Sequence, residues 1–338
     1  MHFLVTGASG FVGRGLLPLL AAHGHTGIAT GRTPPTALPA GWQGVARERV
    51  LSNAVDATNV DAIIHLEVKQ HVPSPTPADI DDFEFVNVAG TREWLDWAAR
   101  HGVERFVFTS SIKAVAASNG PNFETAPLEP DTPYGRSKAR GETLVRKWAA
   151  ADHGRRAVIL RPAPVYGPGN EANLNAFVRQ VLAGRPCLVG TGTTRKSLVS
   201  RGNLAAALEW AAVNAAPGTD VYNVSDRDTL SLAELAATIA ELGGAPSPRA
   251  VPELVARLAA PVGDLVTKLT GLDFPMTTAR LRAIREQSVF PSNKLAAAGF
   301  QHTQTTREGL AEMLAGEDAG RPAERHAGGV PHGGSGSR

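Results

Sequence analysis

The chain begins with a short apolar run, a glycine-rich loop and an apolar helix, and this order limits the folds open to it. Residues 2–6 are typical of a strand buried in a parallel sheet, and leucines recur at helical spacing over 14–23. Glycines in the loop between them would let the backbone approach a pyrophosphate, to which a helix N-terminus offers free N–H groups and a partial positive charge. The GxxGxxG spacing differs from the simplest GxGxxG fingerprint, and an ordinary glycine-rich turn is the alternative. We predict a dinucleotide-binding unit built on Gly7, Gly10 and Gly13.

Further apolar runs predict an α/β fold with a doubly wound parallel sheet of the Rossmann type. In such a sheet ligands bind outside the carboxyl ends of the strands. The run at 105–109 ends at Ser110 and Ser111, so their hydroxyl groups are expected at the same rim as the glycine loop. We expect strands at 2–6, 26–30, 44–47, 61–66, 105–109 and 157–161, with helices over 80–101 and from residue 133.

The end of the second strand bears on which dinucleotide binds. A dinucleotide site usually carries an acid here for the ribose hydroxyls, or a basic residue for a 2′-phosphate. No acid follows the run at 26–30, whereas Arg32 does. We therefore expect NAD(P) as the cofactor with a preference for NADP(H), although Arg32 could equally be a solvated loop residue.

A tyrosine and a lysine stand four positions apart at the start of a predicted helix. Pro133 suits a helix start, so Tyr134 and Lys138 would share one face about one turn apart. A free tyrosine has a pKa near ~10, too high for a base at neutral pH, and a neighbouring cation favours the phenolate. The spacing predicts a proton-transfer pair, against the alternative of an accidental pairing on a surface helix.

Composition narrows the classes of function. The chain has 338 residues, a formal net charge of +2 and no long basic run, so we expect no nucleic-acid partner. The single cysteine, Cys187, cannot form an internal disulfide, which fits a reducing compartment. No apolar stretch reaches the ~18 residues of a membrane span, and the N-terminus lacks the basic region of a secretory signal. We expect a cytoplasmic protein with no membrane partner. His65 is expected to pack or hydrogen-bond at a strand end and His71 has no partner pattern, so we predict no metal.

The pattern of the chain changes after residue 168. We expect residues 1–168 to form the dinucleotide-binding domain, with later strands added from about 195–225. Short mixed elements predict that 169–315 form mainly a substrate-binding lobe. Glycine, proline, histidine and serine dominate the end of the chain, which predicts a disordered tail over 316–338.

Taken in order, these motifs resemble the extended short-chain dehydrogenases/reductases. Within that group the chain is similar to the NAD(P)-dependent sugar-nucleotide epimerase/dehydratase family, which includes the UDP-glucose 4-epimerases. The resemblance covers about residues 2–315. It rests on Thr6–Gly13, Asp61–Leu66, Asn87–Thr91, Phe106–Ser111, Tyr134–Lys138, Arg161–Pro162, Val165–Gly169, Ser197–Val199 and Asn203–Leu204.

The resemblance implies catalytic roles for three residues. Tyr134 would be the general acid/base that acts on a substrate hydroxyl or carbonyl group. Lys138 would hold the nicotinamide ribose and lower the pKa of the tyrosine. Ser111 would hydrogen-bond the same substrate oxygen, with Ser110 as the alternative if the register slips by one residue.

The resemblance also implies binding residues. Asn173 and Arg195 would hold the diphosphate of a nucleotide-sugar, and a guanidinium suits that role because it pairs bidentately with phosphate. For Arg195 a plain surface position is the alternative, and Ser111 would also touch the substrate. The cofactor would be bound by Gly7, Gly10, Phe11, Val12, Gly13, Arg32, Leu66, Asn87, Tyr134, Lys138 and Pro162.

Three departures from the family pattern bear on the substrate. Glu67 and Val68 stand where members usually have two alanines, so a carboxylate would lie near the cofactor or substrate. The acidic residue expected after the third strand is not evident, and Glu48 is a weak substitute. Pro164 occupies a place where many sugar epimerases have a polar substrate contact.

We expect an NAD(P)-dependent epimerase of a nucleotide-sugar, similar to a 4-epimerase, that oxidises its substrate transiently to a keto intermediate. Dehydratases of the family carry an Asp-Glu pair after the serine position. Ile112 and Lys113 stand there, which disfavours 4,6-dehydration.

Two alternatives come from different classes of function. An NADPH-dependent reductase of a keto-sugar or another small carbonyl substrate is favoured by Arg32. A non-catalytic dinucleotide-binding sensor or scaffold is disfavoured by the intact Ser111, Tyr134 and Lys138. Related enzymes often form homodimers through two helices, which here would be those near 80–101 and 133–150.

Overall fold

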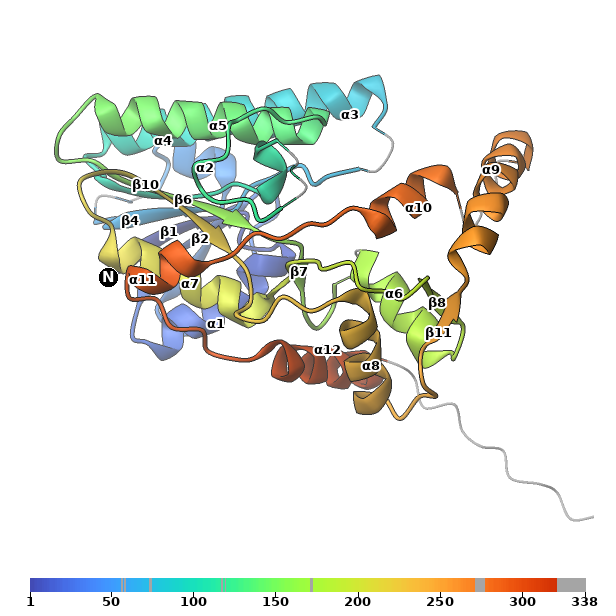
Figure 1. The fold of residues 1–338 in the computed structure, drawn as a ribbon. Helices are drawn as coiled ribbons and strands as arrows, with labels where there is room; N and C mark the ends of the chain where they lie inside the picture. The colour runs from blue at the N-terminus through green and yellow to red at the C-terminus, as the bar shows by residue number, and fades with distance from the viewer. Residues whose placement is uncertain are drawn as a thin grey trace, which may run out of the picture.

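Seven parallel strands form the central sheet, with helices on both of its faces and a smaller lobe of short elements beside it (Figure 1). The computed structural model describes residues 1–320 except 56, 58, 73, 74, 117, 119, 171, 172 and 271–276. The predicted doubly wound parallel sheet is confirmed. Its strands are β1 (His2–Thr6), β2 (Thr26–Gly31), β3 (Trp42–Ala46), β4 (Ala62–His65), β5 (Arg105–Thr109), β6 (Arg156–Pro162) and β10 (Gly218–Val224).

The strand order β3-β2-β1-β4-β5-β6-β10 changes direction between β1 and β4. The chain builds outward from β1 to β3 and then returns to place β4 on the other side of β1. Thr6 pairs with Thr30 of β2 and with His65 of β4, so these three strands end at the same level. Open α/β sheets bind ligands in the crevice outside the strand ends at such a switch point. The topology therefore puts the candidate site at the ends of β1 and β4.

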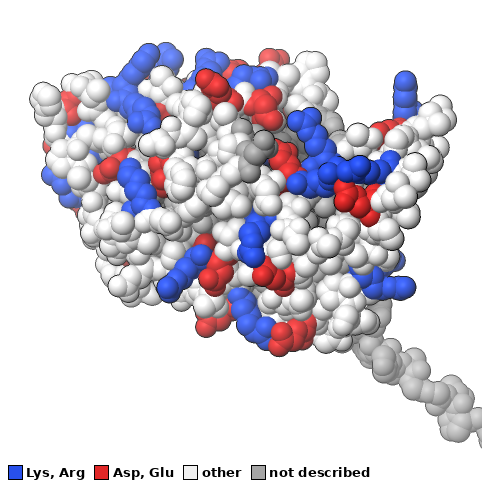
Figure 2. Space-filling view, in the orientation of Figure 1, with Lys and Arg blue, Asp and Glu red and all other residues white. Residues whose placement is uncertain are grey.

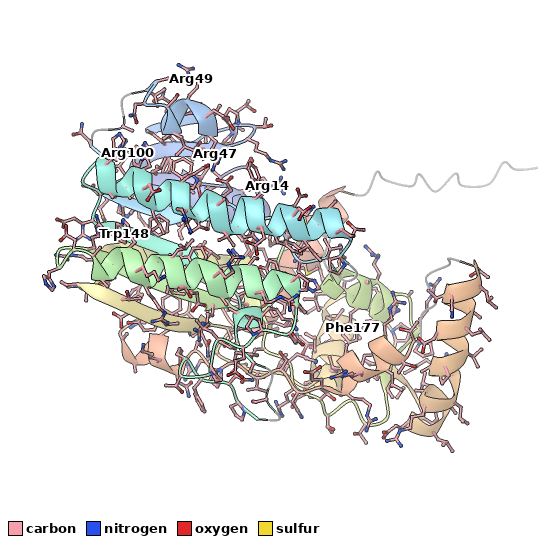
Figure 3. All side chains as sticks on the ribbon, turned by 90° about the horizontal axis from the view of Figure 1, so that it is seen from above. Arg14, Arg47, Arg49, Arg100, Trp148 and Phe177 are labelled. Atoms are coloured by element: carbon pink, nitrogen blue, oxygen red, sulfur yellow. The ribbon has the colours of Figure 1, made fainter. Side chains whose placement is uncertain are left out.

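Two layers of helices bury the two faces of the sheet. One face carries α1 (Phe11–Ala22), α7 (Arg201–Asn214) and α11 (Asn293–Ala297), and the other carries α2 (Arg47–Leu51), α4 (Gly90–Arg100) and α5 (Pro133–Ala150). Phe3 and Val5 pack under the first layer and Leu4 under the second, as the twofold alternation of a strand requires. Figure 3 shows α4 and α5 lying side by side across the second face.

The segment at 77–100 departs from the single helix predicted over 80–101. It consists of α3 (Pro77–Asp82), a π-helical stretch η1 (Phe83–Ala89) and then α4. Thr76 begins α3 with a capping box to Asp79. Stretches of π-helix insert an extra residue into a turn and often occur at functional sites. This stretch contains Asn87, one of the predicted cofactor residues.

The smaller lobe has an apolar core of its own, which includes Tyr166, Val178, Ile239 and Met313. The lobe contains β7 (Val165–Tyr166), α6 (Asn173–Leu182), β8 (Pro186–Val189), β9 (Val199–Ser200), α8 (Leu232–Leu242), β11 (Arg249–Val251), α9 (Glu253–Thr270), α10 (Thr278–Arg285) and α12 (Thr306–Gly320). A 3-10 turn, η2 (Ile112–Ala114), follows β5 in the main body. Among the helices that the structure describes, none is long and apolar enough to cross a bilayer.

The first residues of the disordered tail predicted over 316–338 are helical in the structure. Helix α12 continues to Gly320, because Leu310 and Met313 anchor it by burial in the smaller lobe. A Cβ on Gly316 would lie 2.6 Å from the Cβ of Pro168, so this glycine permits close packing of the helix. The rest of the predicted tail, 321–338, lies outside the described residues.

Candidate active site

The glycine loop lies directly against the end of β4. Gly7 has a φ of +63°, and a Cβ there would lie 2.7 Å from the backbone nitrogen of Glu67. A Cβ on Gly13 would lie 2.3 Å from the carbonyl oxygen of Ala8. Both contacts are with backbone atoms, which cannot move aside as a flexible side chain can. The two glycines therefore let the loop close over the switch point of the sheet.

The N-terminus of α1 is open to an anion. Its N-cap, Gly10, provides no side-chain cap, and the first turn contains no acidic residue. The N–H of Arg14 donates to the Gly10 carbonyl oxygen at 3.0 Å, so the N–H groups of Phe11, Val12 and Gly13 precede the helical ladder. Uncapped N–H groups and the helix dipole favour a phosphate at this position. These residues fit the pyrophosphate of a dinucleotide.

The start of α5 places Tyr134 and Lys138 at the rim of the sheet. Thr132 caps the helix by accepting a hydrogen bond from the Gly135 N–H at 3.1 Å. Lys138 Nζ donates to the carbonyl oxygen of Thr109, at the end of β5, over 2.9 Å. Lys138 is only 3% exposed. This burial lowers the pKa of Lys138 to about 7, against the opposing influence of the Glu142 carboxylate.

Tyr134 stands half-buried beside two other rings. The ring centroids of His71 and Phe83 lie 5.7 and 5.9 Å from that of Tyr134, both edge-on. Burial raises the pKa of Tyr134 to about 12, while a hydrogen bond with the Ser111 side chain acts in the opposite direction. The expected lowering of this pKa by Lys138 is not seen. The Lys138 amine is bonded to a backbone carbonyl, and burial dominates at the phenol.

The two serines after β5 have separate environments. Ser110 is buried and donates a hydrogen bond to the Glu142 carboxylate at 2.7 Å. Ser111 caps η2 and hydrogen-bonds with Tyr134. The structure thus brings Ser111, and not the alternative Ser110, to the phenol.

Asn87 ties the loop after β4 to α5. Its Oδ1 accepts a hydrogen bond from the Lys69 N–H at 2.8 Å, and its Nδ2 donates to the Lys69 carbonyl at 3.2 Å and to Ser137 Oγ at 2.9 Å. Leu66 is buried at the end of β4, and Pro162 ends β6 at the same rim. Leu66 and Pro162 thus lie at the strand ends of the rim where Asn87 joins the loop after β4 to α5.

The other three predicted binding residues lie on separate elements. Arg32 directly follows β2 and is exposed. Asn173 begins α6, and its side chain lies outside what the structure describes. Arg195 forms an ion pair with Glu234 at 3.3 Å and donates to the Thr229 carbonyl, so it is held within the smaller lobe.

An ion pair that the sequence analysis did not predict lies next to the glycine loop. Arg47 Nε is 3.0 Å from Glu67 Oε1, and the Trp94 indole donates to the same carboxylate at 2.8 Å. Arg47 also pairs with Glu93 and lies beside α4 in Figure 3. The family pattern predicts an acidic residue after β3, and Arg47 stands there instead. Glu48, the alternative acidic residue, is exposed. The Glu67 carboxylate is thus neutralised from within the chain.

His65 packs as expected for the end of a buried strand. Its Nδ1 lies 2.8 Å from Thr6 Oγ1 and its Nε2 lies 3.1 Å from Thr91 Oγ1. Burial holds the pKa of His65 well below its usual value, which keeps the ring neutral. Among the described residues, no group of three or more His, Cys, Asp and Glu could hold a metal ion.

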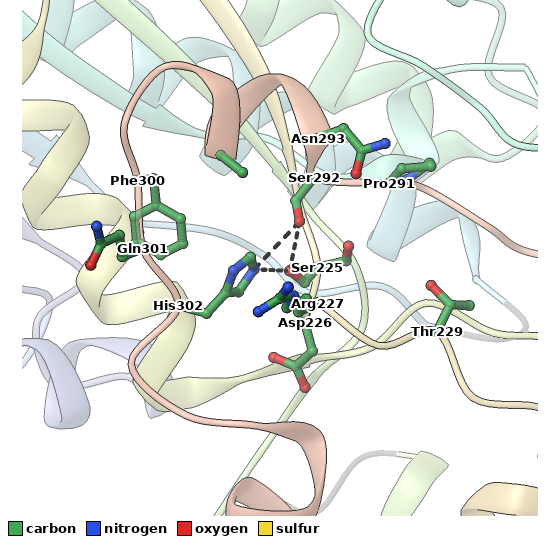
Figure 4. Close-up of a pocket in the computed structure, with 11 residues that line it drawn as sticks. Ser225, Asp226, Arg227, Thr229, Pro291, Ser292, Asn293, Phe300, Gln301 and His302 are labelled. Carbon is green, nitrogen blue, oxygen red and sulfur yellow. Dashed lines mark hydrogen bonds between the residues drawn. The ribbon is translucent and has the colours of Figure 1, made fainter.

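A separate pocket of about 480 Å³ lies beyond the end of β10 (Figure 4). The Asp226 carboxylate at its wall accepts a hydrogen bond from the Tyr166 hydroxyl at 2.7 Å. His302 Nε2 is 2.8 Å from the Ser225 carbonyl oxygen and 3.4 Å from Ser292 Oγ. These polar groups bond to one another and join the sheet to the smaller lobe. They do not include any residue that the sequence analysis placed in the site.

Comparisons with known proteins identify the family of the chain. Residues 3–225 match the model of the NAD dependent epimerase/dehydratase family. The chain is 28% identical over 318 residues to the N-acetyl-alpha-D-glucosaminyl-diphospho-ditrans,octacis-undecaprenol 4-epimerase of Escherichia coli O157:H7, which covers 93% of this chain and 94% of that protein. It is 34% identical over 187 residues to the UDP-glucose 4-epimerase of Vibrio cholerae, covering 54% of this chain and 57% of that one. The UDP-glucuronic acid 4-epimerase of Bacillus cereus, solved with UDP-glucuronic acid and NAD, has the same fold, with a TM-score of 0.72 and 21% identity over 94% of this chain and 100% of that chain.

Proposed function

This chain belongs to the NAD dependent epimerase/dehydratase family of extended short-chain dehydrogenases/reductases, and from that premise we propose that it is a 4-epimerase of a nucleotide-sugar. The observation that supports the proposal is that Ser111 hydrogen-bonds with Tyr134, while Lys138, one turn further along α5, is held on the Thr109 carbonyl at the end of β5. This is the rim that also holds the glycine loop. A nicotinamide dinucleotide bound at this rim would accept a hydride from the sugar carbon and later return it.

In this proposal Tyr134 moves the proton of the reaction. Its phenol and the Ser111 hydroxyl already hydrogen-bond, so together they can hold one substrate oxygen between them. Tyr134 accepts the hydroxyl proton as the sugar carbon is oxidised to a ketone, and returns it when the alcohol is restored on the other face. With a pKa near 12 the phenol is protonated at neutral pH, so it needs a nearby cation to give up its proton. Lys138, one helical turn away, does not lower this pKa in the free protein, and we propose that it supplies the cation once cofactor and substrate are bound.

The test is turnover of purified protein on a panel of UDP-sugars with no cofactor added. We expect Tyr134→Phe to lower turnover about 10²–10⁴-fold, because it removes only the acid/base. Dinucleotide affinity should change less than about twofold, since the glycine loop is untouched. Tyr222→Phe, in β10, is the matched control and should keep wild-type turnover. Turnover of Tyr134→Phe equal to that of the control would refute the assignment.

Arg32 favours a second candidate, an NADPH-dependent reductase of a keto-sugar or another small carbonyl substrate. Arg32 is exposed directly after β2, where a guanidinium could pair with a 2′-phosphate, and it also supports a preference for NADP(H) in either reaction. The same experiment separates the two candidates. An epimerase keeps its nicotinamide through purification and turns over without added cofactor, whereas a reductase consumes one NADPH for each carbonyl group reduced.

The carrier of the sugar is part of the proposal. The Escherichia coli relative is named for a sugar carried on undecaprenyl diphosphate, and it covers nearly all of this chain. Nucleotide and polyprenyl carriers share a diphosphate, so Asn173 and Arg195 could serve either. Because Arg195 is paired with Glu234, it would have to exchange this carboxylate for a phosphate. The substrate panel should therefore include sugars on both carriers.

We also propose a homodimer through α3, η1, α4 and α5. Phe85 of η1 is 73% exposed and Ile80 of α3 is 41% exposed, although both are apolar. Arg140 of α5 forms an ion pair with Glu84 of η1, so these helices present one continuous surface.

A further inference from the structure

Helix α9 packs on the protein through its small residues and turns its large apolar residues outward. Ala256, Ala260 and Gly263 are buried, and the two alanines pack with Leu281 of α10. An ordinary amphipathic helix buries its large apolar side chains instead. Six large apolar residues of α9 are more than half exposed: Leu254 (70%), Val255 (51%), Leu258 (69%), Val262 (57%), Leu265 (56%) and Leu269 (73%). Val266 is half-buried.

The outward apolar sector is too wide for a seam with one other helix. At about 100° per residue, the sector from Pro261 to Ala259 covers about 160° of the helix surface. A two-stranded coiled coil buries a narrower stripe and places charged residues on both sides of it. On α9 the exposed residues of this sector, from Leu254 round to Val255, are flanked by Pro261 on one side and by Val266 and Ala259 on the other, all of them uncharged. The charged residue nearest to the sector is Lys268. The width suits a continuous apolar medium.

The charged residues of α9 are arranged unevenly around this sector. Lys268 borders one edge of it and Arg257 follows, whereas the acidic residues Asp264 and Glu253 lie farther round and are each paired. Glu253 binds Arg257 at 2.8 Å and Arg285 at 3.3 Å. Asp264 accepts a hydrogen bond from the Thr278 N–H at 3.1 Å. The groups next to the apolar sector are therefore basic, which complements an anionic surface.

The helix stands away from the rest of the protein. Figure 1 shows α9 projecting from the smaller lobe, and Figure 2 shows this projection as largely uncharged, with basic and acidic side chains next to one another near its end and at its junction with the body. The helix begins close to Gly190, whose added Cβ would lie 3.8 Å from Glu253 Cβ, and the turn after Gly190 leads to Arg195. A wide exposed apolar sector with a basic residue at its edge is the character of a helix that lies on a bilayer.

We propose that α9 docks the protein on an anionic lipid bilayer. Its apolar sector inserts at the boundary of headgroups and acyl chains, Lys268 lies among the lipid phosphates, and Arg257 joins them by exchanging the Glu253 carboxylate for a phosphate. This inference is independent of the proposed reaction, because it requires neither cofactor nor sugar.

The test is flotation of the full chain with vesicles of phosphatidylcholine and phosphatidylglycerol, beside vesicles of phosphatidylcholine alone. We expect the wild type to float with the anionic vesicles and to bind the neutral ones more weakly. The double substitution Leu258→Glu and Leu265→Glu should lower the partition coefficient by about tenfold or more, because it puts two charges into the apolar sector. Val213→Glu, at an exposed position on α7, is the matched control and should bind as the wild type does. Melting temperatures check that each variant is folded.

Three results would overturn the proposal. The first is a wild type that stays with the lipid-free fraction at every lipid concentration. The second is a double variant that floats as well as the Val213→Glu control. The third comes from light scattering without lipid: a dimer that the α9 substitutions split into monomers would assign the helix to a second copy of the chain.

Discussion

Lys138 has an unusual balance of forces for a cation. It is buried at the end of β5, with its amine on the Thr109 carbonyl and 5.1 Å above the ring of Phe108. The carbonyl and the ring face both favour the charged form, yet burial lowers the pKa of Lys138 to about 7. The side chain therefore changes charge near neutral pH, which suits a group that assists a proton transfer.

This pKa predicts a pH dependence of stability. In the unfolded chain a lysine has a pKa near ~10.4, so between pH 7 and 10 the unfolded state binds more protons than the folded one. The contribution of Lys138 to the free energy of unfolding should therefore rise with pH, by up to about 1.4 kcal/mol per pH unit, and be least favourable below pH 7. Urea unfolding from pH 7 to 9.5 should show this rise in the wild type and lose it in Lys138→Met.

Lys147→Met is the control, because Lys147 is an exposed lysine on the same helix. It should keep the wild-type pH dependence. Parallel stability curves for the wild type and Lys138→Met would contradict the predicted burial of a titrating amine.

Sequence could identify some residues of the site and not others. Tyr134 and Lys138 are four positions apart on a helix, so their spacing alone sets their relation. The choice between Ser110 and Ser111 depends on which hydroxyl group meets Glu142, a contact that appears only when α5 packs on the sheet. The pairing of Arg47 with Glu67 crosses from β3 to β4 with two strands between them, and no local pattern encodes such a contact.

The elements differ in how clearly sequence marks them. Strands β1 and β5 begin and end where the apolar runs predict, because central parallel strands are buried on both faces and appear as continuous apolar segments. The π-helical η1 contains neither proline nor glycine, so nothing in its sequence marks the change of helix type. Helix α9 was not predicted. Its pattern of large and small residues also does not predict which face of the helix is buried, because the buried face is the one that packs against α10.

Close packing of the loop against α1 predicts a selective effect of one methyl group. Gly13→Ala would bring Cβ within 2.3 Å of the Ala8 carbonyl oxygen, so the loop or the helix must shift. Overpacking of this kind typically costs about 1–3 kcal/mol. We expect dinucleotide affinity, measured by titration of the stripped protein, to fall about tenfold or more.

Gly15→Ala is the control, since it makes the same change on the same helix. The three atoms nearest to its Cβ would all belong to the Arg201 side chain, which can move aside. If both variants bound the dinucleotide with equal affinity, the glycine loop would not be the pyrophosphate site.

At the scale of the whole molecule, most of the exposed large apolar side chains fall in two places that predict different partners, and Phe123 and Val213 lie outside both. Those of α9 form the proposed lipid surface, and those of α3 and η1 lie beside α5. We expect light scattering to give the mass of a dimer for the wild type. Phe85→Glu should raise the dissociation constant about tenfold or more, because it places a charge in the centre of the proposed interface.

Phe123→Glu is the matched control, since Phe123 is 52% exposed in a loop outside those helices. It should leave the mass unchanged. A wild type with the mass of one chain, or a Phe85→Glu variant that remains fully paired, would rule out this interface.

The last strand of the sheet, β10, has a consequence for the architecture as a whole. The chain leaves the sheet after β6, builds β7, α6, β8 and β9, covers the sheet with α7, and only then returns to pair Val224 with Pro162. The part of the molecule that holds the seven-stranded sheet is therefore not one uninterrupted stretch of polypeptide. A truncation or proteolytic cut between β6 and β10 would separate the edge strand β10 from the rest of the sheet. We therefore expect that neither fragment stays folded on its own.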